Sequence, residues 1–176
     1  MQCGLPYDQY VSNPDNEAYR VRDTGQPGET ELPVLPHWGF EFDWYGLDTG
    51  SQVAMFSSAG FGPVPAVVMN HERQLYEWTL QCDSLPDLGE CLECPNQPGN
   101  YGDWIRMAER GFFTFDCGSG RYERWTVPSR PILFDELPSA LSRLARIVAL
   151  DLAFDDVSTI DLVELGIPVA TCPQWS

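Results

Sequence analysis

Apolar and polar residues alternate most clearly within residues 38–65, WGFEFDWYGLDTGSQVAMFSSAGFGPVP. The two faces of the first arm are Phe40, Phe42 and Trp44 on one side and Glu41, Asp43 and Tyr45 on the other. Such alternation is typical of a strand with one buried face. A turn at Asp48–Gly50 and a second apolar run at Val53–Phe56 complete a predicted β-hairpin. The glycines and proline of residues 57–63 predict a fixed loop after it.

The pattern changes to helical spacing after this hairpin. Residues 66–80 predict a helix, because Val68, Leu75 and Trp78 recur at roughly helical intervals. Residues 81–100 carry three prolines and two glycines and predict a loop. Asp103 can cap a short helix over residues 104–110, which Gly111 ends.

A second hairpin and a longer helix follow. Residues 112–115 and 122–127 predict two strands joined by the turn of residues 117–120. Residues 137–150 predict a helix that begins at Pro138, since proline is tolerated only in a first turn. Its predicted buried stripe is Leu137, Leu141, Leu144 and Val148. A short edge strand is expected near residues 168–171.

Hairpins that alternate with short helices predict an α+β fold, with a mainly antiparallel sheet and two or three helices packed on it. At 176 residues the chain is expected to form a single domain. Within it we expect an irregular proline-rich arm at residues 1–36, a core at residues 37–150 and an acidic tail at residues 151–176 packed on that core.

The charge of the chain is strongly negative. Twenty-six acidic residues stand against ten basic ones, all arginines, and the formal net charge is −16. A charge of this sign opposes binding to nucleic acid or anionic membranes and favours basic partners. The first ten residues do not resemble a signal peptide, and no apolar run is long enough to span a membrane. We therefore expect a cytoplasmic protein with mostly reduced cysteines.

The sequence contains no recognisable catalytic motif, and we expect neither enzymatic activity nor a cofactor. His37 and His71 are the only histidines, and there is no lysine to complete a phosphate-binding loop. The cysteines at positions 82, 91, 94 and 117 could form a zinc site, but only one C-x-x-C pair is present. Inert thiols are the preferred interpretation. A zinc site or a redox pair stays open as an alternative.

Acidic residues form two clusters in which no basic residue is interspersed. The first is Asp83, Asp87, Glu90 and Glu93, and the second is Asp151, Asp155, Asp156, Asp161 and Glu164. Like charges repel one another, so such clusters favour a basic partner, although solvated loops without any partner remain possible. The predicted partner-binding residues are Asp83, Asp87, Glu90, Glu93, Asp155 and Asp156. We favour the first cluster, because its prolines and Gly89 predict a loop that projects from the body.

Several short motifs occur in a defined order between residues 40 and 150. They are FDWYGLDTGSQVAMFSSAGFGPVP, DWIRMAERGFFTFD and RYERWTVPSRPILFDELPSAL, followed by an aliphatic segment. In this order the chain resembles immunity proteins of bacterial polymorphic toxin systems. The resemblance implies a cytoplasmic protein that binds and blocks a toxin domain made by the same cell, and it implies no active-site residues.

The charge and the resemblance lead to the same hypothesis. An inhibitor can place carboxylates, instead of phosphates, in the basic cleft of a toxin that acts on nucleic acid. We therefore expect an immunity protein for such a toxin, a nuclease or a deaminase. The alternative is a small cytoplasmic enzyme or a zinc-binding protein that uses Cys82, Cys91, Cys94 and Cys117.

Overall fold

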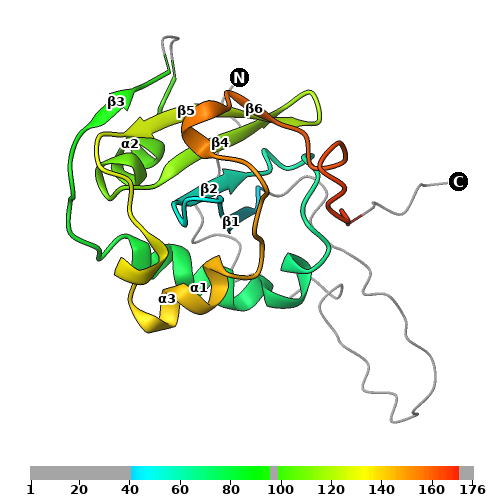
Figure 1. Ribbon diagram of the computed structural model, residues 1–176, viewed down its shortest axis with the longest axis horizontal. Coiled ribbons are helices and arrows are strands. Elements are labelled where there is room, and N and C mark those ends of the chain that lie inside the picture. The colour runs from blue at the N-terminus through cyan, green and yellow to red at the C-terminus, as the bar shows by residue number, and fades with distance from the viewer. Residues whose placement is uncertain (1–40, 96–98, 171–176) are drawn as a thin grey trace, which may run out of the picture. The chain divides into compact units, whose positions relative to one another are not determined.

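The computed structural model describes residues 41–95 and 99–170, which all belong to one compact unit spanning His37–Ser176 (Figure 1). The predicted proline-rich arm of residues 1–36, Phe40 and His37 lie outside the described residues. The strands are β1 (Asp43–Leu47), β2 (Val53–Ser57), β3 (Cys91–Glu93), β4 (Phe113–Gly118), β5 (Arg121–Pro128) and β6 (Thr159–Ile160). The α-helices are α1 (Glu72–Cys82), α2 (Gly102–Glu109) and α3 (Ser139–Ala145), with 3-10 turns at Val68–His71, Phe134–Glu136 and Phe154–Asp156.

These strands form one sheet in the order β1-β2-β4-β5-β3, and β6 also pairs with β5. Among the six described strands, every pairing is antiparallel except that of β2 with β4, which run parallel. Parallel neighbours require a long crossover connection, and here it contains α1, β3 and α2. The predicted α+β class with a mainly antiparallel sheet is confirmed.

The first hairpin has the predicted position, with Asp43 opposite Ser57 and Leu47 opposite Val53. Its turn is fixed by Asp48, whose carboxylate Oδ1 accepts the backbone N–H of Gln52 at 2.8 Å. The expectation of a half-buried strand pair is wrong, because β1 and β2 are covered on both faces of the sheet. Trp44 and Tyr45, which point to opposite faces, are 0% and 1% exposed.

One face of the sheet carries a stack of aromatic rings. Trp44 lies over Phe56 with ring centroids 4.0 Å apart, and Phe56 lies over Phe115 at 5.0 Å. Phe154, from the C-terminal segment, packs edge-on against Phe56 at 6.0 Å. The C-terminal segment therefore covers this face.

The helices lie on the opposite face. Tyr45 meets Trp78 of α1 with centroids 3.5 Å apart, and its hydroxyl forms a hydrogen bond of 2.9 Å with Thr79 Oγ1. Val68, Leu75 and Trp78 are buried as predicted, but α1 begins only at Glu72, and Val68 lies in the 3-10 turn before it. Figure 1 shows α1 and α3 side by side on one side of the sheet, with α2 next to β4 and β5.

The second hairpin is also confirmed, with β4 and β5 joined at Ser119–Gly120. Both turn residues have positive φ, 54° and 82°, as a two-residue turn of a twisted hairpin requires. Gly111 ends α2 with a φ of 93°, and a Cβ there would lie 2.7 Å from the backbone nitrogen of Ile132. Asp103 lies in the first turn of α2 but forms no capping hydrogen bond. The predicted cap is therefore wrong.

The helix predicted over residues 137–150 is wrong in its second half, since α3 ends at Ala145. The chain then extends along the outer edge of β1: Leu47 N donates to Val148 O at 2.9 Å, and Leu150 N donates to Leu47 O at 2.8 Å. Pairing of this kind satisfies backbone groups that an open edge would leave exposed. Val148 is buried as predicted, but in an extended segment.

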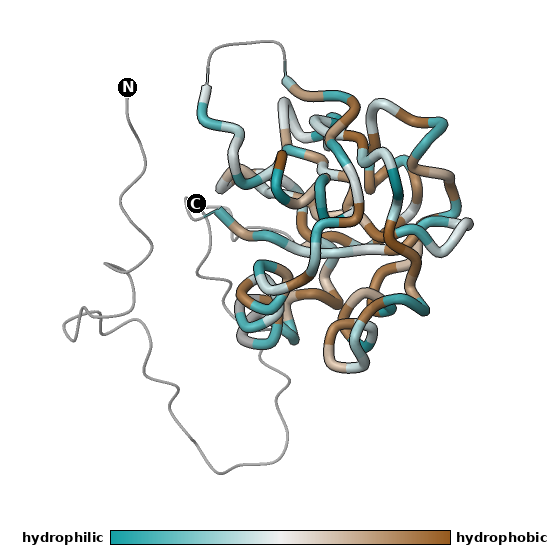
Figure 2. The backbone as a smooth tube through the Cα atoms, turned by 90° about the vertical axis from the view of Figure 1, so that its left-hand side faces the viewer, coloured by the Kyte–Doolittle hydropathy of each residue, from teal (hydrophilic) through white to brown (hydrophobic). Residues whose placement is uncertain are grey.

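Two loop predictions also change. Residues 91–93, predicted as loop, form β3, which pairs with β5. The strand of the tail is β6 at Thr159–Ile160, and the described residues 168–170 of the expected edge strand form one isolated bridge, between Pro65 and Val169. In the described part of the chain no helix is long and apolar enough to cross a membrane, and hydrophobic stretches along the chain are short (Figure 2).

Candidate protein-binding surface

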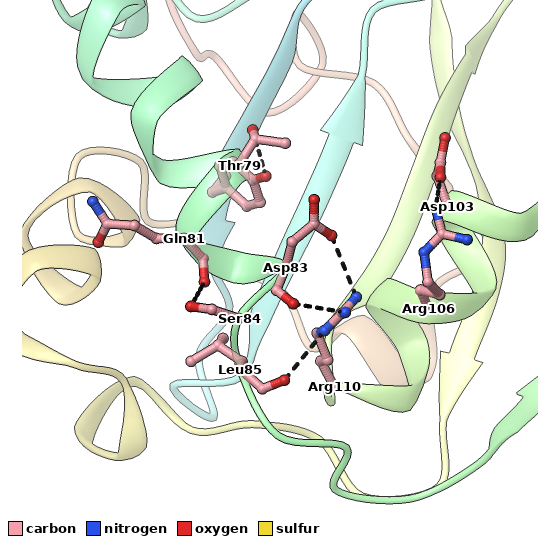
Figure 3. Close-up of polar contacts among 9 residues, drawn as sticks. Thr79, Gln81, Asp83, Ser84, Leu85, Asp103, Arg106 and Arg110 are labelled. Carbon is pink, nitrogen blue, oxygen red and sulfur yellow. Dashed lines mark hydrogen bonds and ion pairs between the residues drawn. The ribbon is translucent and has the colours of Figure 1, made fainter.

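Arg110 holds the start of the first acidic segment, which we define as residues 83–93. Its guanidinium donates to the carbonyl oxygens of Asp83 at 2.9 Å and Leu85 at 3.3 Å, and it forms an ion pair with the Asp83 carboxylate at 3.5 Å (Figure 3). Asp83 directly follows α1, and Arg110 directly follows α2. One arginine thus joins the ends of two helices to this segment.

The middle of the first acidic segment is held by backbone hydrogen bonds. The N–H groups of Leu88 and Gly89 both donate to the carbonyl of Glu109, at 2.8 and 3.1 Å. Ser129 N donates to Glu90 O, and Glu90 N donates to Ser129 Oγ, both at 2.8 Å. The expectation of a projecting loop is therefore wrong, because the backbone lies against α2 and β5. The side chains of Asp87 and Glu90 are nevertheless exposed.

Arg124 of β5 joins the first acidic segment to the second, which we define as residues 151–164. Its Nη2 lies 3.3 Å from Glu93 Oε2, and its Nη1 donates to the carbonyls of Phe154 at 2.9 Å and Asp155 at 3.1 Å. β3 and β6 both pair with β5, which explains why the two segments meet here. The structure thus brings together two clusters that are about sixty residues apart in the sequence.

The second acidic segment is also tied to the first hairpin. Phe154 N donates to Asp48 Oδ2 at 3.0 Å, and Gln52 Nε2 donates to Asp155 Oδ2 at 3.1 Å. Both hairpin residues belong to the turn between β1 and β2. Asp155 and Asp156 are exposed on the 3-10 turn that these contacts position.

The absence of counter-ions, expected from the sequence, is wrong for part of each segment. Asp83 pairs with Arg110, Glu93 pairs with Arg124, and Arg121 pairs with both Asp161 and Glu164 at 3.1 and 3.2 Å. Hydrogen bonds from the backbone N–H groups of Glu164 and Val163 also help to lower the pKa of Asp161.

Among the described residues, four predicted binding residues are exposed and form no ion pair: Asp87, Glu90, Asp155 and Asp156.

A partly buried carboxylate cluster, which the sequence did not predict, lies elsewhere on the sheet. Asp43, Ser57 and Asp116 occupy one row across β1, β2 and β4, and Ser57 Oγ donates to Glu41 Oε1 at 2.8 Å. Burial raises the pKa of Asp43 to about 7, and repulsion from Glu41 and Asp116 adds to the effect. Burial likewise raises the pKa of Asp116 to about 6. The row depends on the parallel pairing of β2 with β4, which no sequence pattern indicated.

Three aromatic side chains form a second feature that the sequence did not predict. Tyr101 and Trp104 of the α2 region lie 5.0 Å from Trp125 of β5, measured between ring centroids, and all three rings are partly exposed. Trp and Tyr are enriched at energetically important positions of protein interfaces. The clustering arises because α2 packs on β5, a contact that periodicity alone does not specify.

The cysteines do not form the four-ligand site considered from the sequence. Cys82 is fully buried at the end of α1. Cys117 lies on β4, against Gly62 of the loop that follows the first hairpin. Of the four cysteines that the structure describes, only Cys91 and Cys94 are close together, with Sγ atoms 3.0 Å apart. Within residues 41–95 and 99–170, no group of three or more His, Cys, Asp or Glu side chains is arranged to hold a metal ion.

Comparisons with known proteins add no relative: no protein-family model, curated protein or solved structure matches the chain significantly. The functional interpretation therefore depends on charge, exposure and geometry.

Proposed function

We propose that this chain is a non-enzymatic immunity protein that binds and neutralises a cognate bacterial toxin domain. The toxin is a nucleic-acid-targeting enzyme, a nuclease or a deaminase, and the protein occludes its basic active-site cleft. One observation carries this proposal: Asp87, Glu90, Asp155 and Asp156 are exposed on backbone segments that hydrogen bonds hold in place.

The fixed backbone matters because binding loses affinity when flexible groups must be ordered. Exposed carboxylates on an ordered backbone can meet arginines or lysines of a basic cleft without that loss. The formal net charge of −16 steers such a partner toward the protein and speeds association. Rapid association suits an inhibitor that must act before its toxin does damage.

The ion pairs restrict the proposed contact to part of each segment. Asp83 and Glu93 already have arginine partners, so a toxin gains less from them than from the unpaired carboxylates. The interface is therefore centred on Asp87 and Glu90 or on Asp155 and Asp156. Arg124 links the two segments, and both can contribute to one interface.

Charge reversal tests this proposal with the toxin domain encoded by the neighbouring gene. Asp87→Arg/Glu90→Arg and Asp155→Arg/Asp156→Arg are titrated separately against that domain. Reversal of the docking pair should weaken binding by about 2 kcal/mol or more, because like charges then face one another. Asp135→Arg is the control, since Asp135 is exposed on another 3-10 turn and lies in neither segment.

Salt provides a second measurement on the same complex. Association of the unaltered protein should slow as ionic strength rises, because salt screens exposed charges over about 10 Å at 0.1 M. Unchanged affinity of both double variants would show that neither of these segments forms the interface. A salt-independent complex would remove the electrostatic basis of the proposal, and absence of any binding would contradict the immunity function itself.

A further inference from the structure

Cys91, the first residue of the edge strand β3, and Cys94, which follows its last residue, form a close pair of thiols. Their Sγ atoms are 3.0 Å apart, and the Cys91 thiol also donates to the carbonyl of Glu93 at 2.9 Å. Cys91 is partly buried, whereas Cys94 is exposed. The side chains therefore converge across the two intervening residues, Leu92 and Glu93.

A metal ion does not account for this pair. Structural zinc takes four ligands in tetrahedral geometry, and the pair supplies two. No third candidate ligand converges on it among the residues that the structure describes. Cys82 and Cys117 are held elsewhere in the fold, so they cannot complete a site without rearrangement of the core.

We infer that Cys91 and Cys94 are a modification site: an oxidisable dithiol that forms an intramolecular disulfide by exchange with a small-molecule disulfide such as oxidised glutathione. The separation of 3.0 Å must shorten to about 2.05 Å, the length of a disulfide bond. Cys91 is fixed, because it lies opposite Pro128 of β5. Cys94 lies beyond the last residue of β3, so the small movement falls on this exposed residue.

The first step assigns Cys94 as the attacking thiol. Burial, together with the adjacent Cys94 thiol, raises the pKa of Cys91 to about 12, which keeps Cys91 protonated. Cys94 loses its proton to solvent, and its thiolate attacks one sulfur of oxidised glutathione. The S–S bond of glutathione breaks, a Cys94–glutathione mixed disulfide forms, and one glutathione thiolate leaves.

The second step closes the ring. In the mixed disulfide the Sγ atom of Cys94 still lies beside the Cys91 thiol, since the two Sγ atoms are 3.0 Å apart before the reaction. Cys91 then loses its proton and attacks Cys94 Sγ, and the second glutathione thiolate leaves. The net reaction oxidises two cysteine thiols and reduces one glutathione disulfide to two thiols. This inference does not depend on the proposed immunity function.

Peptide mapping of the complete chain tests the inference directly. An endoproteinase that cleaves after glutamate separates all six cysteines, because it releases Cys91–Glu93 and Cys94–Glu109 as different peptides. The protein is equilibrated in a series of glutathione redox buffers, trapped with acid and digested. The expected product is residues 91–93 linked to residues 94–109, in excess over any other pairing.

Two variants distinguish the order of attack. In Cys91→Ser the intermediate cannot be resolved, so Cys94 should accumulate as the glutathione adduct. In Cys94→Ser, Cys91 should stay reduced. Cys117→Ser is the matched control and should leave the Cys91–Cys94 product unchanged. Free thiols, stable glutathione adducts or links to Cys82 in the unaltered protein would each overturn the inference.

Discussion

Arg124 on β5 and Glu93 on β3 form an ion pair across adjacent strands, with Nη2 and Oε2 3.3 Å apart. The same guanidinium donates to the carbonyls of Phe154 and Asp155, and the Arg124 side chain is only 15% exposed. A single cation thus connects the edge strand β3, its neighbour β5 and the C-terminal segment.

Removal of Arg124 should loosen both acidic segments. Arg124→Ala takes charge-assisted donors away from two backbone carbonyls, and we expect the free energy of unfolding to fall by about 1–3 kcal/mol. Arg121→Ala is the control, because Arg121 is 54% exposed and forms ion pairs that should contribute less than about 1 kcal/mol. Urea denaturation measures both variants, and equal losses would contradict the special role of Arg124.

Truncation of Trp44 should be among the most damaging changes in the chain. Trp44 is fully buried against Phe56, and its Nε1 donates to the hydroxyl of Tyr122 at 2.9 Å. Trp44→Ala should lower the free energy of unfolding by about 3–5 kcal/mol, as other large aromatic truncations do. Leu92→Ala, on a side chain that is 64% exposed, should change it by less than about 0.5 kcal/mol. Chemical denaturation monitored by fluorescence compares the two.

Stability should fall as pH rises from about 4 to about 7. The pKa of Asp43 is about 7 in the folded protein and 3.8 when unperturbed, so the folded state binds more protons over this interval. Asp116, with a pKa of about 6, acts in the same direction. Asp43→Asn should remove part of this slope and gain on the order of 1–3 kcal/mol at pH 8.

The control for this pH effect is Asp135→Asn, since Asp135 is an exposed acid in a 3-10 turn away from the carboxylate row. It should leave the dependence of the free energy of unfolding on pH unchanged. Denaturation curves at several pH values between 4 and 8 give the slopes. A slope in Asp43→Asn equal to that of the unaltered protein would show that the pKa of Asp43 is not raised in the folded state.

Zinc should not be a constituent of the folded protein. The cysteines offer one pair and no four-ligand site in the described residues. Purified protein should contain far less than a stoichiometric amount of zinc, and a chelator should leave the melting temperature unchanged. Stoichiometric zinc that survives dialysis would favour the alternative of a metal-binding protein.

The sequence by itself determined the elements in which local patterns and packing agree. Both hairpins were predicted because the alternation of apolar and polar residues and the turn residues act over a few neighbouring positions. Trp44 was correctly placed in the core for the same reason. The α+β class followed from the order of these elements, in which hairpins alternate with short helices.

Only the tertiary structure decided how distant segments meet. The stripe from Leu137 to Val148 favoured one long helix, but hydrogen bonds with Leu47 drew its second half into an extended edge. The parallel pairing of β2 with β4 placed Asp43 and Asp116 in one row. Residues 83–93 and 151–164 looked unpaired because their arginines lie far along the chain. Local spacing carries no information about such contacts, since they depend on how the whole chain packs.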